Sequence, residues 1–252
     1  MIPNLLTAGN LIGGILAIIA ALTGHLELAP YFILISAVLD FLDGFVARLL
    51  QVQSELGKQL DSLADMVTFG VAPGIIVYQF FLLSLRLQGL QEYNWLAYAA
   101  FLLPVSALFR LAKFNLDNRQ TDHFIGLPTP AMTLFFATFP LLFHKIEFLH
   151  PLSFEFCLLS WLGHPVILIF LIVLFSVLML LEIPLFALKF KHFKWKGNEI
   201  RYVFLTISVV LLATLFVWAL PLIIVLYLIL SVINNFIRKQ SETKSAKDEI
   251  QS

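Results

Sequence analysis

The chain has 252 residues, of which 60% are hydrophobic and only 13% are charged, and sixteen Lys and Arg residues balance sixteen Asp and Glu residues. A water-soluble domain of this length carries far more charge, so the composition excludes that class and indicates a polytopic membrane protein. The net charge of zero provides no general basic surface for nucleic acid, and the single cysteine, Cys157, excludes an intrachain disulfide.

Apolar segments of about 20 residues, the length of a helix that crosses a bilayer, follow one another along the chain. From this length rule we expect an all-α polytopic membrane helix bundle with about eight transmembrane helices. The expected spans are residues 4–24, 30–50, 58–85, 94–115, 128–149, 163–188, 201–218 and 220–238. The chain has no Lys or Arg before Arg48, which favours a first span over a cleaved signal peptide. Trp218 and Pro221 favour a tight turn between the last two spans, with one kinked helix as the alternative.

An even number of spans places both termini on one side of the membrane, and the basic residues agree with this arrangement. Fourteen of the sixteen Lys and Arg residues fall on the side of the termini, and only Arg86 and Lys145 fall on the other. Because basic loops remain in the cytoplasm, we expect an integral protein of the cell (inner) membrane with both termini cytoplasmic. Residues 1–238 form the transmembrane domain in this interpretation, and residues 239–252 form a polar, disordered cytosolic tail.

The first span carries two sets of residues with helical spacing. Small residues recur at steps of four: Gly9, Gly13, Ala17 and Ala21. Such a stripe lets another membrane helix pack closely against it. Asn4 and Thr7 are three residues apart and share a face, and from spacing alone they are typical of a helix cap or a polar pair at the membrane interface.

Four aspartates lie within the second and third spans, in the segment "DFLDGFVARLLQVQSELGKQLDSLAD", residues 40–65: Asp40, Asp43, Asp61 and Asp65. Each would cost roughly 2.5–3.5 kcal/mol at the centre of a membrane helix. The first two share one helical face, and the last two share a face of the next helix. The connection between these helices is short, so we expect antiparallel neighbours whose acidic faces oppose each other near the cytoplasmic surface.

Divalent cations would remove the repulsion between four converging carboxylates. The ligands are all oxygen atoms, with no neighbouring His or Cys, so Mg²⁺ or Mn²⁺ fits better than Zn²⁺. Four aspartates can serve two ions roughly 3.5–4 Å apart, the arrangement that catalyses phosphoryl transfer. Small residues on the same faces, Gly44, Ala47 and Gly57, leave room for a base or a phosphate. The alternative, acids that merely end helices at the water interface, would explain one aspartate better than four.

Written as a pattern, the segment is D-x2-D-G-x2-A-R-x8-G-x3-D-x3-D. At every position it resembles the signature of the CDP-alcohol phosphatidyltransferase family. The resemblance implies a six-helix catalytic core, here with two further spans, and a homodimer. It also implies transfer of a phosphatidyl group from a CDP-linked lipid to an alcohol, with release of CMP.

The same resemblance implies roles for single residues. The four aspartates would hold the metal ions and the CDP pyrophosphate, and Asp65 would also be the general base. The implied CDP-binding residues are Asn4, Thr7, Asp40, Gly44, Ala47, Arg48, Gly57 and Asp61. Arg48 could instead order the aspartates, or be an interface residue whose charge extends to water.

Four further segments resemble one branch of the family, the membrane-integral phosphatidylserine synthases. They are "IPNLLTAGN" (2–10), "SLADMVTFGVAPG" (62–74), "FRLAKFN" (109–115) and "GLPTPA" (126–131). The branch implies CDP-diacylglycerol and L-serine as substrates, with other membrane lipids as neighbours. The serine carboxylate is then expected to lie near Arg110, Lys113 and Asn115, because cationic and amide groups bind carboxylates. The positive charge usual in cytoplasmic loops explains the two cations equally well. Lys113 stands where the branch more often has Arg, and it cannot bind a carboxylate through two parallel hydrogen bonds.

Two other functions remain open at this point. Family members with another acceptor, such as glycerol 3-phosphate, inositol or serine on an ether lipid, share the aspartates and differ only in the flanking motifs. A cation transporter with a carboxylate site is the alternative from another class. Transporters commonly divide such a site between repeated halves with broken helices. Here all four acids lie in one helical hairpin, and the sequence contains no matching half.

Overall fold

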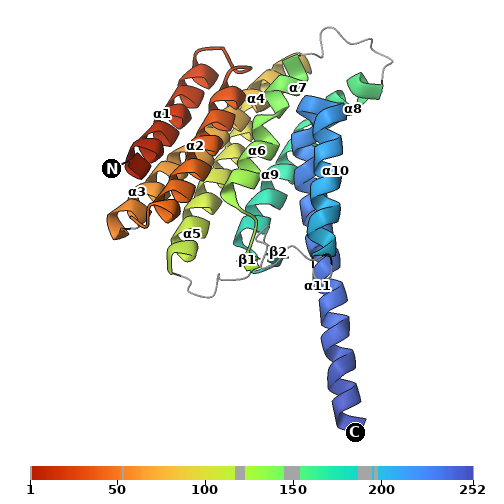
Figure 1. Ribbon diagram of the computed structural model, residues 1–252. Coiled ribbons are helices and arrows are strands. Elements are labelled where there is room, and N and C mark those ends of the chain that lie inside the picture. Colours follow the sequence, from red (N-terminus) through yellow and green to blue (C-terminus); the bar gives the residue numbers. More distant parts are fainter. Residues whose placement is uncertain are drawn as a thin grey trace.

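The computed structural model describes residues 2–52, 54–116, 123–144, 154–186, 195 and 198–251. It is a bundle of helices with one short two-stranded sheet (Figure 1). The N-terminal elements are α1 (Ile2–Leu22), α2 (Ala29–Leu49), α3 (Glu55–Asp65), the π-helical segment η1 (Met66–Val71), α4 (Ala72–Leu87), the 3₁₀ helix η2 (Gln91–Phe101) and α5 (Leu102–Leu116). The later elements are β1 (His123–Ile125), α6 (Thr129–Ala137), α7 (Phe139–His144), α8 (Phe154–Leu162), α9 (Pro165–Leu180), β2 (Pro184–Phe186), α10 (Glu199–Leu215), the 3₁₀ turn η4 (Phe216–Trp218) and α11 (Ala219–Gln251).

The expected all-α membrane architecture is confirmed. Within the described residues, four helical stretches are long and apolar enough to cross a membrane: Ile2–Leu22, Glu55–Leu87, Gln91–Leu116 and Glu199–Asn235. Two shorter apolar stretches accompany them, Thr129–His144 and Pro165–Leu180. These helices establish integration into the membrane, while the number of eight spans stays a prediction.

Small side chains bring α1 and α2 together, which makes α2 the helix that packs on the predicted stripe of small residues. A Cβ atom on Gly13 would overlap the hydroxyl group of Ser36 in α2. Ala17 and Ala21 continue the stripe, and both are buried in a cluster that includes Ile33 of α2. The close approach of these two helices is therefore built on the spacing of small residues in α1.

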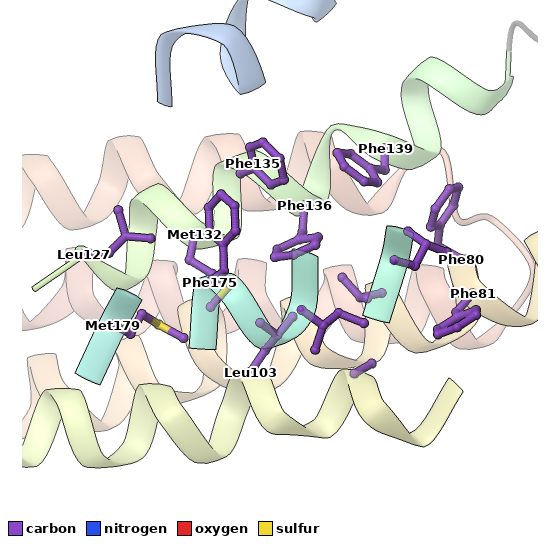
Figure 2. Close-up of a cluster of buried hydrophobic side chains, with 14 of the residues drawn as sticks. Phe80, Phe81, Leu103, Leu127, Met132, Phe135, Phe136, Phe139, Phe175 and Met179 are labelled. Carbon is purple, nitrogen blue, oxygen red and sulfur yellow. The ribbon is translucent and has the colours of Figure 1, made fainter. Parts of the chain in front are cut away.

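Aromatic side chains form the larger core, which joins α4 and α5 to α6 and α9 (Figure 2). The rings of Phe135 and Phe175 stack with centroids 4.3 Å apart. Phe80 of α4 meets Phe143 edge to face, with centroids 4.6 Å apart. Each such ring buries about 150–250 Å² of surface, so this core fixes α4 and α5 against the C-terminal half of the chain.

The helix ends agree with a chain that crosses the bundle in alternating directions. In Figure 1 the start of α1, the α2–α3 connection, the end of α5 and both strands lie toward one end of the bundle, whereas α7 and α8 lie toward the other. The last apolar stretch also folds back, since the chain turns at Phe216, where φ is +48°, and α11 packs against α10. The structure therefore has the expected turn near Trp218 and not one kinked helix.

Several predicted boundaries differ from the structure, and prolines explain two of the differences. The helix predicted over 128–149 is interrupted at Thr138, because Pro140 has no N–H to continue the hydrogen-bond ladder. The helix predicted over 163–188 ends at Leu180, and Leu181 already has an extended backbone three residues before Pro184. The predicted ends 145–149 and 187–188 lie outside the described residues.

Three described elements were not expected from the sequence. The first is the short helix α8, and the second is the antiparallel pairing of β1 with β2, in which residue 124 lies opposite residue 185. The third is the helical tail, since α11 continues to Gln251 where disorder was predicted. The tail contains no Gly or Pro and is rich in good helix formers, which accounts for this difference.

Gly126 should be difficult to replace, because it follows β1 with a φ of +75°. A Cβ atom there would also lie 2.8 Å from the carbonyl oxygen of Met179. Gly126→Ala should therefore reduce the free energy of unfolding by more than the roughly 1–3 kcal/mol that a left-handed backbone alone costs. The melting temperature of the purified protein in detergent checks this.

Gly24→Ala is the matched control for this prediction. Gly24 also has a positive φ, +88°, but nothing lies within 4 Å of a Cβ atom placed there. Its substitution should show the backbone cost alone. Equal losses in the two variants would contradict the role of close packing at Gly126.

Candidate active site

Helices α2 and α3 present the aspartates from opposite directions. Asp40 and Asp43 lie in the last three turns of α2, and Asp61 and Asp65 lie in the second half of α3. Ser54 caps the start of α3, because its Oγ accepts a hydrogen bond of 3.0 Å from the backbone N–H three residues later. The two helices therefore bring acids that are far apart in sequence to one place.

Three of the four aspartates form one cluster. Carboxylate oxygens of Asp40, Asp61 and Asp65 all lie within 4.8 Å of one another. Asp43 lies outside this trio and is buried, with only 5% of its surface exposed. The hydroxyl group of Thr7 in α1 donates a hydrogen bond of 2.5 Å to its Oδ2. The structure thus gathers three acids closely and holds the fourth beside them through α1.

This cluster fits a hard divalent cation. Its ligand atoms are carboxylate oxygens, and the cluster contains neither His nor Cys. The Oδ1 atom of Asp61 is buried and has no hydrogen-bond partner among the described residues. A buried carboxylate oxygen without a partner is costly, and coordination of a cation would satisfy it.

A cavity of about 230 Å³ opens beside the cluster, between α1 and the α2–α3 hairpin. Its lining residues are Pro3, Asn4, Thr7, Asp43, Gly44, Ala47, Arg48, Val52, Ser54, Gly57, Lys58 and Asp61. Every residue that the family resemblance assigned to CDP is among them except Asp40, which lies in the carboxylate cluster. The predicted residues therefore surround one space, although their binding roles stay predictions.

Small residues keep this cavity open. A Cβ atom on Gly44 would have no neighbour closer than the guanidinium of Arg48, at 3.9 Å, so the missing side chain leaves free space. A Cβ atom on Gly57 would lie 3.1 Å from Ser54 Oγ and 3.8 Å from the amide oxygen of Asn4. The two glycines thus face the cavity from α2 and α3.

Sequence reasoning missed four lining residues: Pro3, Val52, Ser54 and Lys58. Ser54 had a signal, since serine before a helical run is typical of a helix cap. Lys58 forms an exposed ion pair with Glu55, and their Nζ–Oε1 distance is 2.9 Å. Val52 and Pro3 had no chemical signal, and only the folded hairpin shows that they adjoin the cavity.

The three residues expected at serine have different environments in α5. Arg110 is 7% exposed, its Nε has no hydrogen-bond partner among the described residues, and its guanidinium interacts electrostatically with Asp65. Asn115 is exposed and lies against α3, where its Nδ2 donates to Ser62 Oγ at 2.9 Å. Lys113 is exposed. Although Arg110 and Lys113 are three residues apart, only Arg110 is buried in the bundle.

The aspartate pattern, the carboxylate cluster and the adjoining cavity can now be compared with known proteins. Residues 1–233 match the family described as CDP-alcohol phosphatidyltransferase. The chain belongs to this family.

Similar proteins from three organisms carry the same name. A protein of Helicobacter pylori strain 26695, named CDP-diacylglycerol–serine O-phosphatidyltransferase, is 34% identical over 241 residues, which is 92% of this chain and 90% of the relative. A Bacillus subtilis protein of the same name is 40% identical over 129 residues, which is 51% of this chain and 69% of the relative. A Methanocaldococcus jannaschii protein of that name is 36% identical over 138 residues, 55% of this chain and 59% of the relative.

Family membership makes this chain a membrane-integrated transferase of phospholipid metabolism. Members of the family generally depend on a metal ion, and the three-carboxylate cluster gives this chain a place for one. The cavity between α1 and the α2–α3 hairpin is correspondingly the candidate active site.

Proposed function

We propose that this chain transfers a phosphatidyl group from CDP-diacylglycerol to the hydroxyl group of L-serine, forming phosphatidylserine and releasing CMP. The similarity to the Helicobacter pylori relative of that activity, over 92% of the chain, is the observation that carries the choice of serine. The gathering of the motif residues around one cavity supports the same reaction.

In this proposal the CDP group occupies the cavity and the lipid tails stay in the bilayer. Asn4 and Thr7 contact the nucleotide from α1, and Gly44, Ala47 and Gly57 leave space for it. Arg48 contributes positive charge where the phosphates would lie. Asp40, Asp43, Asp61 and Asp65 hold two ions, Mg²⁺ or Mn²⁺, which neutralise the pyrophosphate when bound.

Asp65 is the proposed general base. Its carboxylate takes the proton from the serine hydroxyl group while the serine oxygen attacks the phosphorus that carries diacylglycerol. The new P–O bond replaces the bond to the bridging pyrophosphate oxygen, so CMP leaves with the electron pair of the broken bond. We propose one direct displacement, without a covalent enzyme intermediate.

Feeding the purified enzyme CDP-diacylglycerol with serine, inositol or glycerol 3-phosphate in parallel tests the acceptor. The expected main product, identified by mass, is phosphatidylserine. A different phospholipid as the main product would overturn serine but leave the family activity intact. Absence of CMP release with any of these alcohols would overturn the transferase activity itself.

Arg110 is the proposed partner of the serine carboxylate, because its guanidinium is buried near Asp65 and its Nε is unpaired among the described residues. Loss of one charge-assisted hydrogen bond costs roughly 1.5–3 kcal/mol, or about ten- to a hundred-fold in binding. Arg110→Ala should therefore raise the KM for serine by that factor and leave the KM for CDP-diacylglycerol nearly unchanged. Steady-state kinetics with each substrate varied in turn provides the measurement.

Lys113→Ala is the matched control, since Lys113 is the exposed cation of the same motif. It should change the KM for serine much less, and Arg110→Lys, which keeps the charge, should fall between the two alanine variants. Equal effects at positions 110 and 113 would contradict the assignment of the carboxylate to Arg110. Asn115 is proposed to act at the edge of this site, from its contact with Ser62.

We further propose that both termini and the active site face the cytoplasm, in the cell (inner) membrane, and that the enzyme is a homodimer. The common location of the α1 start, the α2–α3 connection and the end of α5 supports the orientation. Cysteines introduced at positions 58 and 86 of a Cys157→Ser variant should label from opposite sides of intact cells. Labelling of position 58 from outside would reverse the orientation, and a monomeric mass in detergent would argue against the dimer.

A further inference from the structure

Asn10 is a buried polar residue of α1 that has no role in the reaction described so far. Its side chain is 0% exposed, and its Nδ2 donates a hydrogen bond of 3.2 Å to Oδ1 of Asp65. It is the last residue of the segment "IPNLLTAGN", in which only Asn4 and Thr7 received a function. Asn10 therefore contacts the proposed base directly from a neighbouring helix.

The backbone of Asn10 is fixed by two other segments. Its carbonyl oxygen accepts a hydrogen bond of 3.2 Å from Ser36 Oγ in α2 and one of 3.1 Å from Thr68 Oγ1 in the π-helical segment. Both donors are buried. Three segments thus meet at one carbonyl group, which leaves the side chain of Asn10 little freedom to move away from Asp65.

The glycine pair that follows in α1 makes this meeting possible. A Cβ atom on Gly13 would overlap the Ser36 hydroxyl group, and one on Gly14 would lie 2.8 Å from the Cα atom of Thr68. The carbonyl of a helical residue lies beside the residues three and four positions later. Only glycines there allow both hydroxyl groups to reach the carbonyl of Asn10.

Packing alone does not explain an asparagine at this position. Its Oδ1 is buried without a hydrogen-bond partner among the described residues. Such an unsatisfied group costs roughly 1–3 kcal/mol, so a leucine of similar size would suit a merely structural role better. The amide is of use here because it supplies an N–H donor to a carboxylate.

That donor matters because Asp65 lies among other negative charges. Oxygens of Asp40 and Asp61 lie within 4.8 Å of it, and like charges at this distance repel one another. A neutral amide does not reduce the negative charge of the cluster, but its N–H group fixes one oxygen and thus the orientation of the second. The hydrogen bond from Asn10 therefore restricts the Asp65 carboxylate to one orientation.

We propose that Asn10 is a positioning residue for Asp65, whose amide orients the carboxylate that takes the acceptor proton and whose backbone is anchored by Ser36 and Thr68. The inference rests on the proposed function, because it assigns Asn10 to the base of that reaction. It adds a residue of α1 to a site whose acids all come from α2 and α3.

Two variants test this role. Asn10→Leu removes the N–H donor together with the unsatisfied oxygen. Asn10→Asp keeps the shape of the side chain but puts a carboxylate oxygen in place of the N–H donor. Loss of a hydrogen bond to a charged group corresponds to about ten- to a hundred-fold, so both should lower kcat by that factor. The KM for CDP-diacylglycerol should change little, and the melting temperature of Asn10→Leu should not fall.

Thr133→Val is the matched control, because the buried hydroxyl group of Thr133 donates to the carbonyl of Phe69 at 2.9 Å without touching an aspartate. It should lower the melting temperature and leave kcat close to that of the wild type. A wild-type kcat in Asn10→Leu would overturn the inference. The inference would also fail if kcat fell only in proportion to the melting temperature in all three variants, Asn10→Leu, Asn10→Asp and Thr133→Val.

The wild-type assay separates this inference from the proposed function. If the wild-type enzyme uses an alcohol other than serine, the choice of serine fails, and the Asn10 variants are compared with that alcohol. If the wild-type enzyme forms phosphatidylserine and the Asn10 variants match its kcat, only the role of Asn10 fails. No CMP release from the wild-type enzyme with any alcohol overturns both.

Discussion

Asp65→Asn should lower turnover at least ~10²-fold, the lower end of what a general base contributes. The substitution keeps the size of the side chain and removes its ability to take a proton. Asp65 is the aspartate best placed for that role, since it belongs to the carboxylate cluster, accepts a hydrogen bond from the amide of Asn10 and interacts electrostatically with Arg110. Rates of CMP release at saturating substrates measure the loss, and binding of the CDP-lipid should survive better than turnover.

Glu55→Gln is the control for this variant. Glu55 also lies in α3, but it is an exposed acid whose partner is Lys58. Its substitution should leave turnover within about two-fold of the wild-type value, as expected for a surface ion pair of small energy. Near-normal turnover of Asp65→Asn would mean that another group takes the proton.

Removal of divalent cations should abolish activity. The three clustered carboxylates and the unpaired Oδ1 of Asp61 are the structural reason for this expectation. Activity should vanish in EDTA and return with excess Mg²⁺ or Mn²⁺, whereas Zn²⁺, which prefers nitrogen and sulfur ligands, should substitute poorly. Measurement of CMP release after dialysis against each ion decides the order of preference.

A second measurement does not depend on turnover. CDP should raise the melting temperature of the purified protein only when Mg²⁺ or Mn²⁺ is present, because the carboxylates otherwise repel the pyrophosphate. Asp61→Asn should weaken this stabilisation, and Glu55→Gln should not. Full activity in chelator, or equal stabilisation by CDP without metal, would rule out the two-ion site.

Residue spacing predicted the helical hairpin with its acidic faces, because that prediction needs only the helical repeat. The separations between Asp40 and Asp43, and between Asp61 and Asp65, are those of neighbours on one helix face. Spacing also predicted that another helix packs on Gly13 and its small neighbours, and the structure shows that this helix is α2. It could not separate Asp43 from the other three acids, because that difference depends on the hydrogen bond from Thr7 in another helix.

Long-range contacts account for the remaining differences. The link from Asn10 to Ser36 and Thr68 joins three segments, and none of these residue types is unusual in its own segment. The unequal burial of Arg110 and Lys113 likewise depends on where α5 leaves the bundle and not on their spacing. A turn was predicted from Trp218 and Pro221, and the chain turns slightly earlier, at Phe216, so that Pro221 lies in the first turn of α11.

The π-helical segment between Asp65 and α4 changes which residues of the third membrane helix share a face. A π turn holds about one residue more than an α turn, and one residue corresponds to about 100° around the helix axis. Residues 66–71 therefore put α3 and α4 out of phase, although the two form one continuous rod of 33 residues. A single helical wheel drawn through both would place the acids and the core phenylalanines on wrong relative faces. One span can thus turn its acidic side to α1 and to Asp40 of α2, and then, after the π-helical offset, turn its aromatic side to α6 and α9.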